Sequence, residues 1–221
     1  MAPLITPDTT ATISPDSNII VFKDGFKSSN FSSKSKKADP IQQSHDDNKD
    51  PLWGEIAKGI KHSIDLGSFQ AVTGRFSDEA LTEIRKHPAV AFVERDIVGQ
   101  RLNNSSSSPS ETREAASSRL VFKLAKETQP VPVSTLRSNG NGTVSDFIAV
   151  VDYIARNQLM RTNGGGIDEK KVSHDESILS VPFAFTNSRS MILAVTKAFE
   201  SGLHLALGNG ATASNTNVEK L

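Results

Sequence analysis

The sequence predicts an antiparallel α+β domain in the first half of the chain and a smaller α/β segment in the second half. The first prediction rests on two runs rich in apolar and β-branched residues, 60–66 and 69–76, which are joined by the hairpin signal Gly67-Ser68. The second rests on helical apolar patterns that alternate with extended apolar segments after residue 142. Alternation of that kind is typical of a parallel α/β arrangement.

The first half begins with a β-branched run at 18–23, which predicts a strand ending at the turn signal Asp24-Gly25. Residues 26–49 show no clear period, so a weak helix and disorder both stay open there. Apolar positions in 52–60 form a short helical face.

A better defined helix follows the hairpin. Ser77 is expected to cap it, with Asp78 and Glu79 in the first turn, where acidic side chains are favoured by the helix dipole. His87-Pro88 ends this helix, and 90–94 reads as a final strand. The order strand, uncertain helix, strand, strand, helix, strand is the split β-α-β arrangement of ferredoxin-like domains, an antiparallel sheet with two helices.

The second half contains two predicted helices. The first starts at Ser145-Asp146 and the second is capped by Asn187 or Ser188 and stopped by Gly202. Residues 177–185 should be extended, and 203–207 should form a buried strand.

Composition limits the classes of function. Lys+Arg and Asp+Glu both number 25, so net charge gives no argument for nucleic acid or an anionic membrane as a partner. The chain has no Cys, which excludes disulfides and thiolate metal sites. No cofactor or metal is predicted: His45, Asp46 and Asp47 lack the spacing of metal ligands. No signal peptide is visible in 1–15, and the apolar runs are too short for a membrane span.

Three segments in the first half carry a resemblance: NIIVFKDG, HSIDLGSFQAVTGRFSDEALTEIRKHP and VAFVERD. Together, over 17–98, they resemble the propeptide of fungal subtilisin-like peptidases of the proteinase K and cerevisin type. The resemblance implies an intramolecular chaperone and inhibitor, whose sheet packs on the peptidase and whose tail lies along the substrate cleft. It places the sheet interface at Phe69, Ala71 and Thr73, and the inhibitory tail at Val93, Glu94, Arg95, Asp96, Ile97, Val98, Gly99 and Gln100.

The second half resembles a piece of the catalytic domain of the same family. GTVSDFIAVVDYIA is similar to the surface helix after the substrate-binding strand, and MILAVTKAFESGLHLALGNG to the next helix and the strand leading to the oxyanion-hole asparagine, here Asn209. The family's D-T-G or D-S-G, H-G-T and G-T-S motifs do not occur, so no catalytic residue is assigned. The interval 100–142 is too short for the missing Asp and His lobes, and the chain ends before the serine half would begin. Without a nucleophile Asn209 reads as a turn residue.

Other candidate sites have a simpler interpretation. Ser173, His174 and Asp175 are consecutive and cannot stack nucleophile, base and orienting group in line. The run 164–166 (Gly-Gly-Gly) follows no strand and precedes no Gly-Lys-Ser/Thr, so it reads as a loop. His62 and His204 fall at strand positions and are interpreted as packing residues.

The predicted organisation is a flexible arm (1–16), a propeptide-like inhibitor domain (17–100), a Ser-rich linker (101–142), a remnant of the catalytic domain forming a partial α/β subtilisin-like segment (143–217) and a tail (218–221). The resemblance implies that the sheet packs in cis on the two retained helices, 145–156 and 188–201. Asp78 or Glu79 is expected to cap the N-termini of those helices.

These observations favour a catalytically inactive inhibitor or chaperone-like protein. Its partner would be a subtilisin-like serine peptidase in trans or its own two helices in cis. The alternatives are an incomplete serine endopeptidase and a relic without function. The resemblance points to the vacuole or the secretory route, whereas the absence of a visible signal peptide points to the cytosol or a truncated start.

Overall fold

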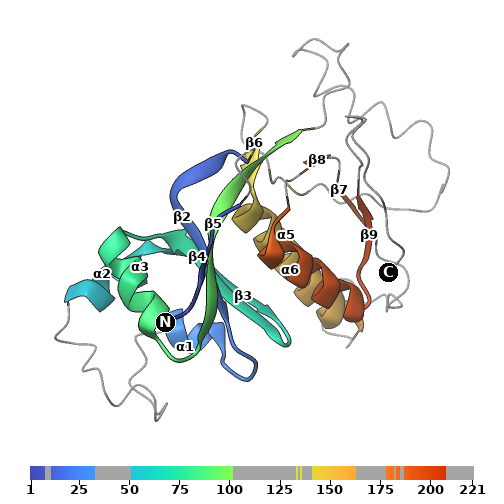
Figure 1. The fold of residues 1–221 in the computed structure, drawn as a ribbon. Helices are drawn as coiled ribbons and strands as arrows, with labels where there is room; N and C mark the ends of the chain where they lie inside the picture. Colours follow the sequence, from blue (N-terminus) through green and yellow to red (C-terminus); the bar gives the residue numbers. More distant parts are fainter. Residues whose placement is uncertain are drawn as a thin grey trace, which may run out of the picture.

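The computed structural model describes residues 1–7, 11–32, 51–101, 133, 135, 141–162, 178–181, 183–184 and 187–207. In this part of the chain a seven-stranded sheet has helices on both of its faces (Figure 1). Its central order is β1-β5-β2-β4-β3, and β6 and β8 both pair with β5. The strands are β1 Leu4–Ile5, β2 Ile13–Phe22, β3 Ile60–Leu66, β4 Phe69–Arg75, β5 Val90–Arg101, β6 Asn141–Thr143 and β8 Phe183–Ala184.

Four of these strands confirm the predicted ferredoxin-like arrangement. β2, β4, β3 and β5 pair antiparallel in the spatial order β5-β2-β4-β3. Helices α1 Ser28–Ser32 and α2 Pro51–Gly59 lie between β2 and β3 in the chain, and α3 Asp78–Lys86 lies between β4 and β5. The β3–β4 hairpin closes at the Leu66–Phe69 pair, and Gly67 takes a φ of 65°, which a residue with a side chain rarely adopts.

Helix α3 starts and ends as the sequence predicts. The Ala80 amide donates a hydrogen bond to the Ser77 hydroxyl at 3.2 Å, which satisfies one of the free amides of the first turn. His87 is the C-terminal cap. Ala80, Leu81 and Ile84 are buried, so the apolar face of the helix lies against the sheet.

The second half folds as helix, strands, helix and strand. Helix α5 spans Val144–Thr162, α6 spans Arg189–Glu200, and β7 Ile178–Val181 pairs in parallel with β9 His204–Leu207. Ser188 caps α6 by accepting a hydrogen bond from the Met191 amide at 3.2 Å. Gly202, with a φ of 89°, follows its last turn. The parallel α/β pattern is therefore confirmed for the described residues.

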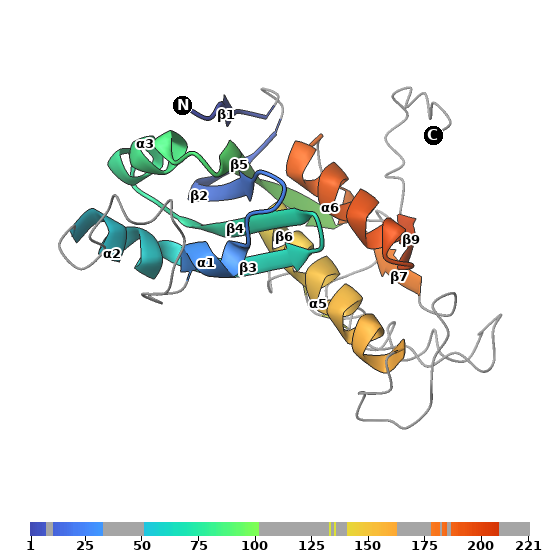
Figure 2. The same cartoon turned by 90° about the horizontal axis from the view of Figure 1, so that it is seen from below.

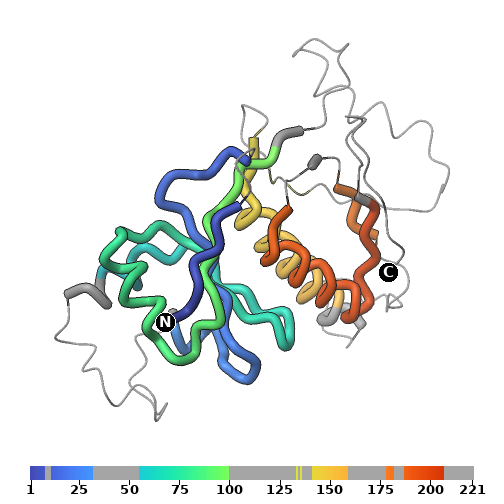
Figure 3. The backbone as a smooth tube through the Cα atoms, viewed as in Figure 1, coloured from blue at the N-terminus to red at the C-terminus, as the bar shows by residue number. Residues whose placement is uncertain are grey.

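The sheet separates two apolar cores. Figure 2 shows the helices on its two sides, α2 and α3 on one and α5 and α6 on the other. One face of β2, β4 and β5 packs with α2 and α3, through a cluster that includes Ile20, Val72 and Ile84. The other face packs against α5 and α6. Figure 3 traces the same arrangement, with the paired helices α5 and α6 lying beside the sheet.

The prediction of a flexible arm at 1–16 is wrong for the described residues, which contribute to two strands. Leu4 and Ile5 form β1, which pairs in parallel with Val93 and Glu94 of β5, and β2 already begins at Ile13. The Ala2 amide also donates to the Arg85 carbonyl at 2.7 Å. A two-residue apolar pair is too short to stand out in the sequence, but here it covers an edge of β5.

Several expectations lie outside the described residues. These are Asn209, the run 173–175, the glycines at 164–166, the cluster at 45–47, and nearly all of the interval between β5 and β6. No helix among the described residues is long and apolar enough to cross a membrane.

Candidate functional site

The face of the sheet toward α5 and α6 is the first part of the site. Phe69 and Ala71 are buried in one apolar cluster with residues of both helices, and Thr73, on the same face of β4, is also buried. The buried helix side chains in this cluster are Val144, Phe147, Ile148, Val151 and Ala155 from α5 and Ala194 and Ala198 from α6. Both alanines of α6 are fully buried. The structure therefore brings the predicted sheet interface into contact with the two predicted helices.

Glu94 is the second part. Its carboxylate accepts hydrogen bonds from the Arg189 amide at 3.0 Å, the Ser190 amide at 2.8 Å and the Ser190 hydroxyl at 2.5 Å. The side chain is 1% exposed. Arg189 and Ser190 are the first residues of α6, whose leading amides have no partner within the helix. A buried negative charge at this end of a helix is stabilised by both the hydrogen bonds and the helix dipole.

Asp96 caps the N-terminus of α5 in the same way. The Ser145 amide donates to it at 3.0 Å, and the hydroxyls of Ser145 and Ser17 donate at 2.6 and 2.8 Å. Asp96 is fully buried, and Ser145 stands in the first turn of α5. Two carboxylates, two residues apart on one strand, thus cap two neighbouring helices.

The prediction that Asp78 or Glu79 caps these two helices is therefore wrong. Both lie in the first turn of α3, on the opposite face of the sheet from α5 and α6. Asp78 is exposed and reaches Arg95 at 3.6 Å, while hydrogen bonds from its own backbone amide and from Ser77 lower the pKa of Glu79. The period of 2 in a strand places Phe92, Glu94 and Asp96 on one face, and this was the signal that could have identified the true caps.

A polar seam joins the outer strand β3 to α5. Asp146 Oδ1 lies 2.5 Å from Lys61 Nζ and 3.1 Å from His62 Nε2. The hydrogen bond from His62, and then the hydrogen bond and charge of Lys61, hold the pKa of Asp146 well below its usual value, although burial opposes this. Further along, the Asp65 amide donates to Asp152 at 3.0 Å. His62, interpreted from the sequence as a packing residue, is thus a contact between the two halves.

The tail is the third part. The end of β5 pairs antiparallel with β6 through Val98–Thr143, Gly99–Gly142 and Gln100–Asn141. On its other side it pairs with β8 through Gln100–Ala184 and Arg101–Phe183. Figure 1 shows this end of β5 running from the sheet to β6 and β8. The predicted tail is an extended strand held from both sides, and the strand continues to Arg101.

Within the tail, successive residues serve different faces. Glu94 and Asp96 point to the helices, Val93 belongs to the core with α3, and Ile97 is buried with the helix cluster. Arg95 reaches across to α3. The tail is therefore anchored along most of its length before it reaches β6.

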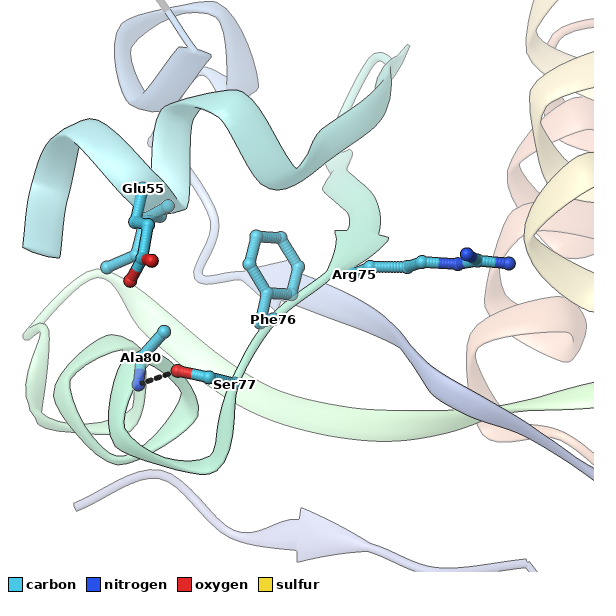
Figure 4. Close-up of a pocket in the computed structure, with 6 residues that line it drawn as sticks. Glu55, Arg75, Phe76, Ser77 and Ala80 are labelled. Atoms are coloured by element: carbon cyan, nitrogen blue, oxygen red, sulfur yellow. Dashed lines mark hydrogen bonds between the residues drawn. The ribbon is translucent and has the colours of Figure 1, made fainter.

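Two hollows border these elements. One, of about 170 Å³, lies between α2, the end of β4 and the start of α3 (Figure 4). Phe76 faces it, the Ser77 hydroxyl is committed to capping α3, and Arg75 points away. The other, of about 440 Å³, lies at the junction of β3, β4 and the start of α5, and includes Lys61 and Ser145. No group of three or more potential metal-ligating side chains occurs among the described residues.

The fold and the site together define a domain that docks on a pair of helices and offers a strand-like tail. Comparison with known proteins gives the family. The model of the peptidase inhibitor I9 family matches residues 17–101. Residues 17–101 therefore match the peptidase inhibitor I9 domain, and the chain is homologous to subtilisin-like serine proteases over most of its length.

Two kinds of relative support this. The subtilisin-like serine protease Cur l 4.0101 of Cochliobolus lunatus is 22% identical over 95% of this chain and 57% of its own length. Subtilisin-like protease 3 of Saccharomyces cerevisiae is 34% identical over 40% of this chain and 18% of its own length. Subtilisin-like protease 8 of Arthroderma benhamiae is 32% identical over 43% of this chain and 21% of its own length.

The chain spans little more than half the length of the relatives that it matches throughout. The Cochliobolus alignment is 294 residues long, whereas this chain has 221 residues. That relative therefore holds stretches inside the aligned region that have no counterpart here.

Proposed function

We propose that this chain is an inhibitor of a subtilisin-like serine peptidase and has no peptidase activity of its own. The observation that carries the proposal is the pair of buried carboxylates, Glu94 and Asp96, set on one strand so that each caps a helix N-terminus. A sheet face built this way recognises two parallel helices at a fixed spacing. Apolar packing supplies the contact area, and the two charges select the helix ends.

The tail supports the same proposal. An extended segment adds to exposed strand edges through backbone hydrogen bonds, which is how peptidases hold peptides in their clefts. Here the end of β5 is already extended and lies between two strands of the subtilisin-like block. In trans, the corresponding helices and cleft strands of a complete peptidase would take those positions.

The lack of catalytic motifs argues against hydrolysis by this chain. Acyl transfer by a serine peptidase needs a nucleophile, a base within hydrogen-bond reach and a group that orients the base. The 221 residues contain none of the three motifs in which this family sets those side chains. The homology to serine proteases therefore extends to the fold and not to the catalytic motifs.

The test is inhibition of a purified subtilisin-type peptidase of the proteinase K class, followed with a small chromogenic substrate. The chain should inhibit saturably, and the chain alone should give no hydrolysis. Absence of inhibition at concentrations up to about 100 μM, equivalent to a binding free energy weaker than about −5.5 kcal/mol, would contradict the proposal. Hydrolysis by the chain alone would instead favour a serine endopeptidase.

A further inference from the structure

We propose that the subtilisin-like block of this chain is a built-in competitor that keeps the inhibitor latent. The block is defined here as the described residues of 141–207, comprising β6, α5, β7, β8, α6 and β9. The inference rests on the proposed function, because it states how inhibition in trans is regulated. Release of the block would be the step that activates the inhibitor.

The capping oxygens of the sheet are already used. Glu94 Oε1 accepts from the Arg189 amide, and Oε2 accepts from the amide and hydroxyl of Ser190. Asp96 Oδ1 accepts from the Ser145 amide, and Oδ2 from two hydroxyls. Both carboxylates are buried beneath these helices. A second pair of helices cannot reach them until α5 and α6 leave.

Both edges of the tail are also paired. Gln100 pairs with Asn141 on one side and Ala184 on the other. Val98 pairs with Thr143, and its amide donates to the Thr12 carbonyl at 2.8 Å. Strand addition to a peptidase cleft requires edges of the tail that these pairings cover.

The block makes side-chain contacts with the sheet that a helix pair without these side chains would not make. The Arg189 guanidinium lies 4.7 Å from the centre of the Phe92 ring, a cation–π contact. Asp152 of α5 accepts a hydrogen bond from the Asp65 amide of β3. Lys61 and His62 hold Asp146. Each favours this block over a competitor.

The block is also covalently attached to the inhibitor. Gln100 and Asn141 are a ladder pair, so the intervening sequence of about 40 residues starts and ends at the same place, and the closed contact is intramolecular. Linked partners meet at effective concentrations of the order of a millimolar. The apparent inhibition constant is the intrinsic constant divided by the open fraction. Closure therefore weakens inhibition without changing the inhibitory surface.

Latency makes substitutions on the two sides of one contact act differently. Ser190→Ala removes a hydroxyl that donates a hydrogen bond to Glu94 from the block side, so it should open the chain and lower the inhibition constant several-fold. Glu94→Gln weakens both the closed contact and the contact with the peptidase, so it should lower that constant less than Ser190→Ala does. A purely structural role for the block would make both substitutions weaken inhibition.

The decisive experiment locks the block by a reversible bond. Val98 and Thr143 are partners in an antiparallel ladder, where opposite Cα atoms lie about 4.5–5.5 Å apart, within the range that a disulfide spans. The chain has no Cys, so Val98→Cys/Thr143→Cys introduces a single possible bridge. Inhibition is measured on the oxidised double variant and on the same sample after reduction and desalting. Each single variant serves as a control for redox effects of one thiol.

The oxidised form should inhibit at least tenfold more weakly than the reduced form. Equal inhibition by the two forms would overturn latency and leave the proposed function standing. The same conclusion would follow if the folded double variant inhibited but could not form the disulfide. If neither the double variant nor the wild type inhibits, the proposed function itself fails and the inference with it.

Discussion

Glu94 and Ser190 are 96 positions apart in the chain, yet the Glu94 carboxylate accepts both the backbone amide and the hydroxyl of Ser190. The contact is buried and joins the I9 domain to the first turn of α6. Together with Asp96 and Ser145 it fixes how the sheet and the two helices meet. The following predictions test this relationship and the packing around it.

Glu94→Gln should destabilise the folded chain. The amide keeps the shape of the side chain but turns a donor toward an N–H group and removes the charge from the helix N-terminus. Hydrogen bonds to a charged group each contribute about 1.5–3 kcal/mol, so a loss of about 2 kcal/mol in the free energy of unfolding is expected. Urea denaturation measures it. Asp78→Asn is the matched control, because Asp78 is exposed and should change stability by less than about 0.5 kcal/mol.

Phe69→Ala should loosen the helix pair selectively. Phe69 packs with α5 and α6, whereas Phe76 packs in the other core with α3, and both rings are 4% exposed. Either substitution to alanine should cost about 3–5 kcal/mol. Amide hydrogen exchange should rise first in α5 and α6 for Phe69→Ala, and first in α3 for Phe76→Ala. Unchanged exchange in α5 and α6 for Phe69→Ala would contradict the packing of the helices on the sheet.

The seam at Asp146 should respond to acid. The pKa of its carboxyl is lower in the folded chain than in the unfolded chain, first because His62 donates a hydrogen bond to it. Such a group stabilises the fold above its unfolded pKa, near 4, and that contribution is lost as the pH falls through this value toward the folded pKa. The stability advantage of the wild type over Asp146→Asn should therefore be full near pH 5 and shrink below about pH 4. Denaturation curves that differ by the same amount at both pH values would refute this.

Local patterns were enough to predict most elements of the fold. The hairpin at Gly67, the Ser77 cap and the apolar faces of α3 and α6 are encoded by neighbouring residues, so sequence reasoning identified them. β1 was missed because its two apolar residues form a strand only by pairing with the edge of β5, and a pair this short gives no local pattern. Helix α5 runs to Thr162, beyond the 145–156 expected, because polar residues late in the helix weaken the apolar period.

The site was harder to predict for a physical reason. The docking face follows from strand alternation, and Phe69 and Ala71, which the resemblance indicated, lie in one apolar cluster with residues of α5 and α6. The capping residues depend on where two distant helix ends arrive. Asp78 and Glu79 were favoured because acids in a first turn suit a helix dipole, but the helix they serve is their own. Glu94 and Asp96 lie in a strand that reads as ordinary alternating sequence until α5 and α6 are in place.

The proposed function makes the two buried carboxylates the helix-recognition groups of an I9-type inhibitor. The most direct measurement is the inhibition constant of the double variant Glu94→Gln/Asp96→Asn against a subtilisin-type peptidase, beside wild type and Asp78→Asn. Because the same carboxylates hold the block closed, each apparent constant is multiplied by the open fraction, taken from hydrogen exchange in α5 and α6, to give the intrinsic constant. Each lost charged cap should cost about 1.4 kcal/mol or more, so the intrinsic constant should rise by about a hundredfold, while Asp78→Asn leaves it within twofold. Equal intrinsic constants for all three proteins would show that the carboxylates do not recognise the peptidase.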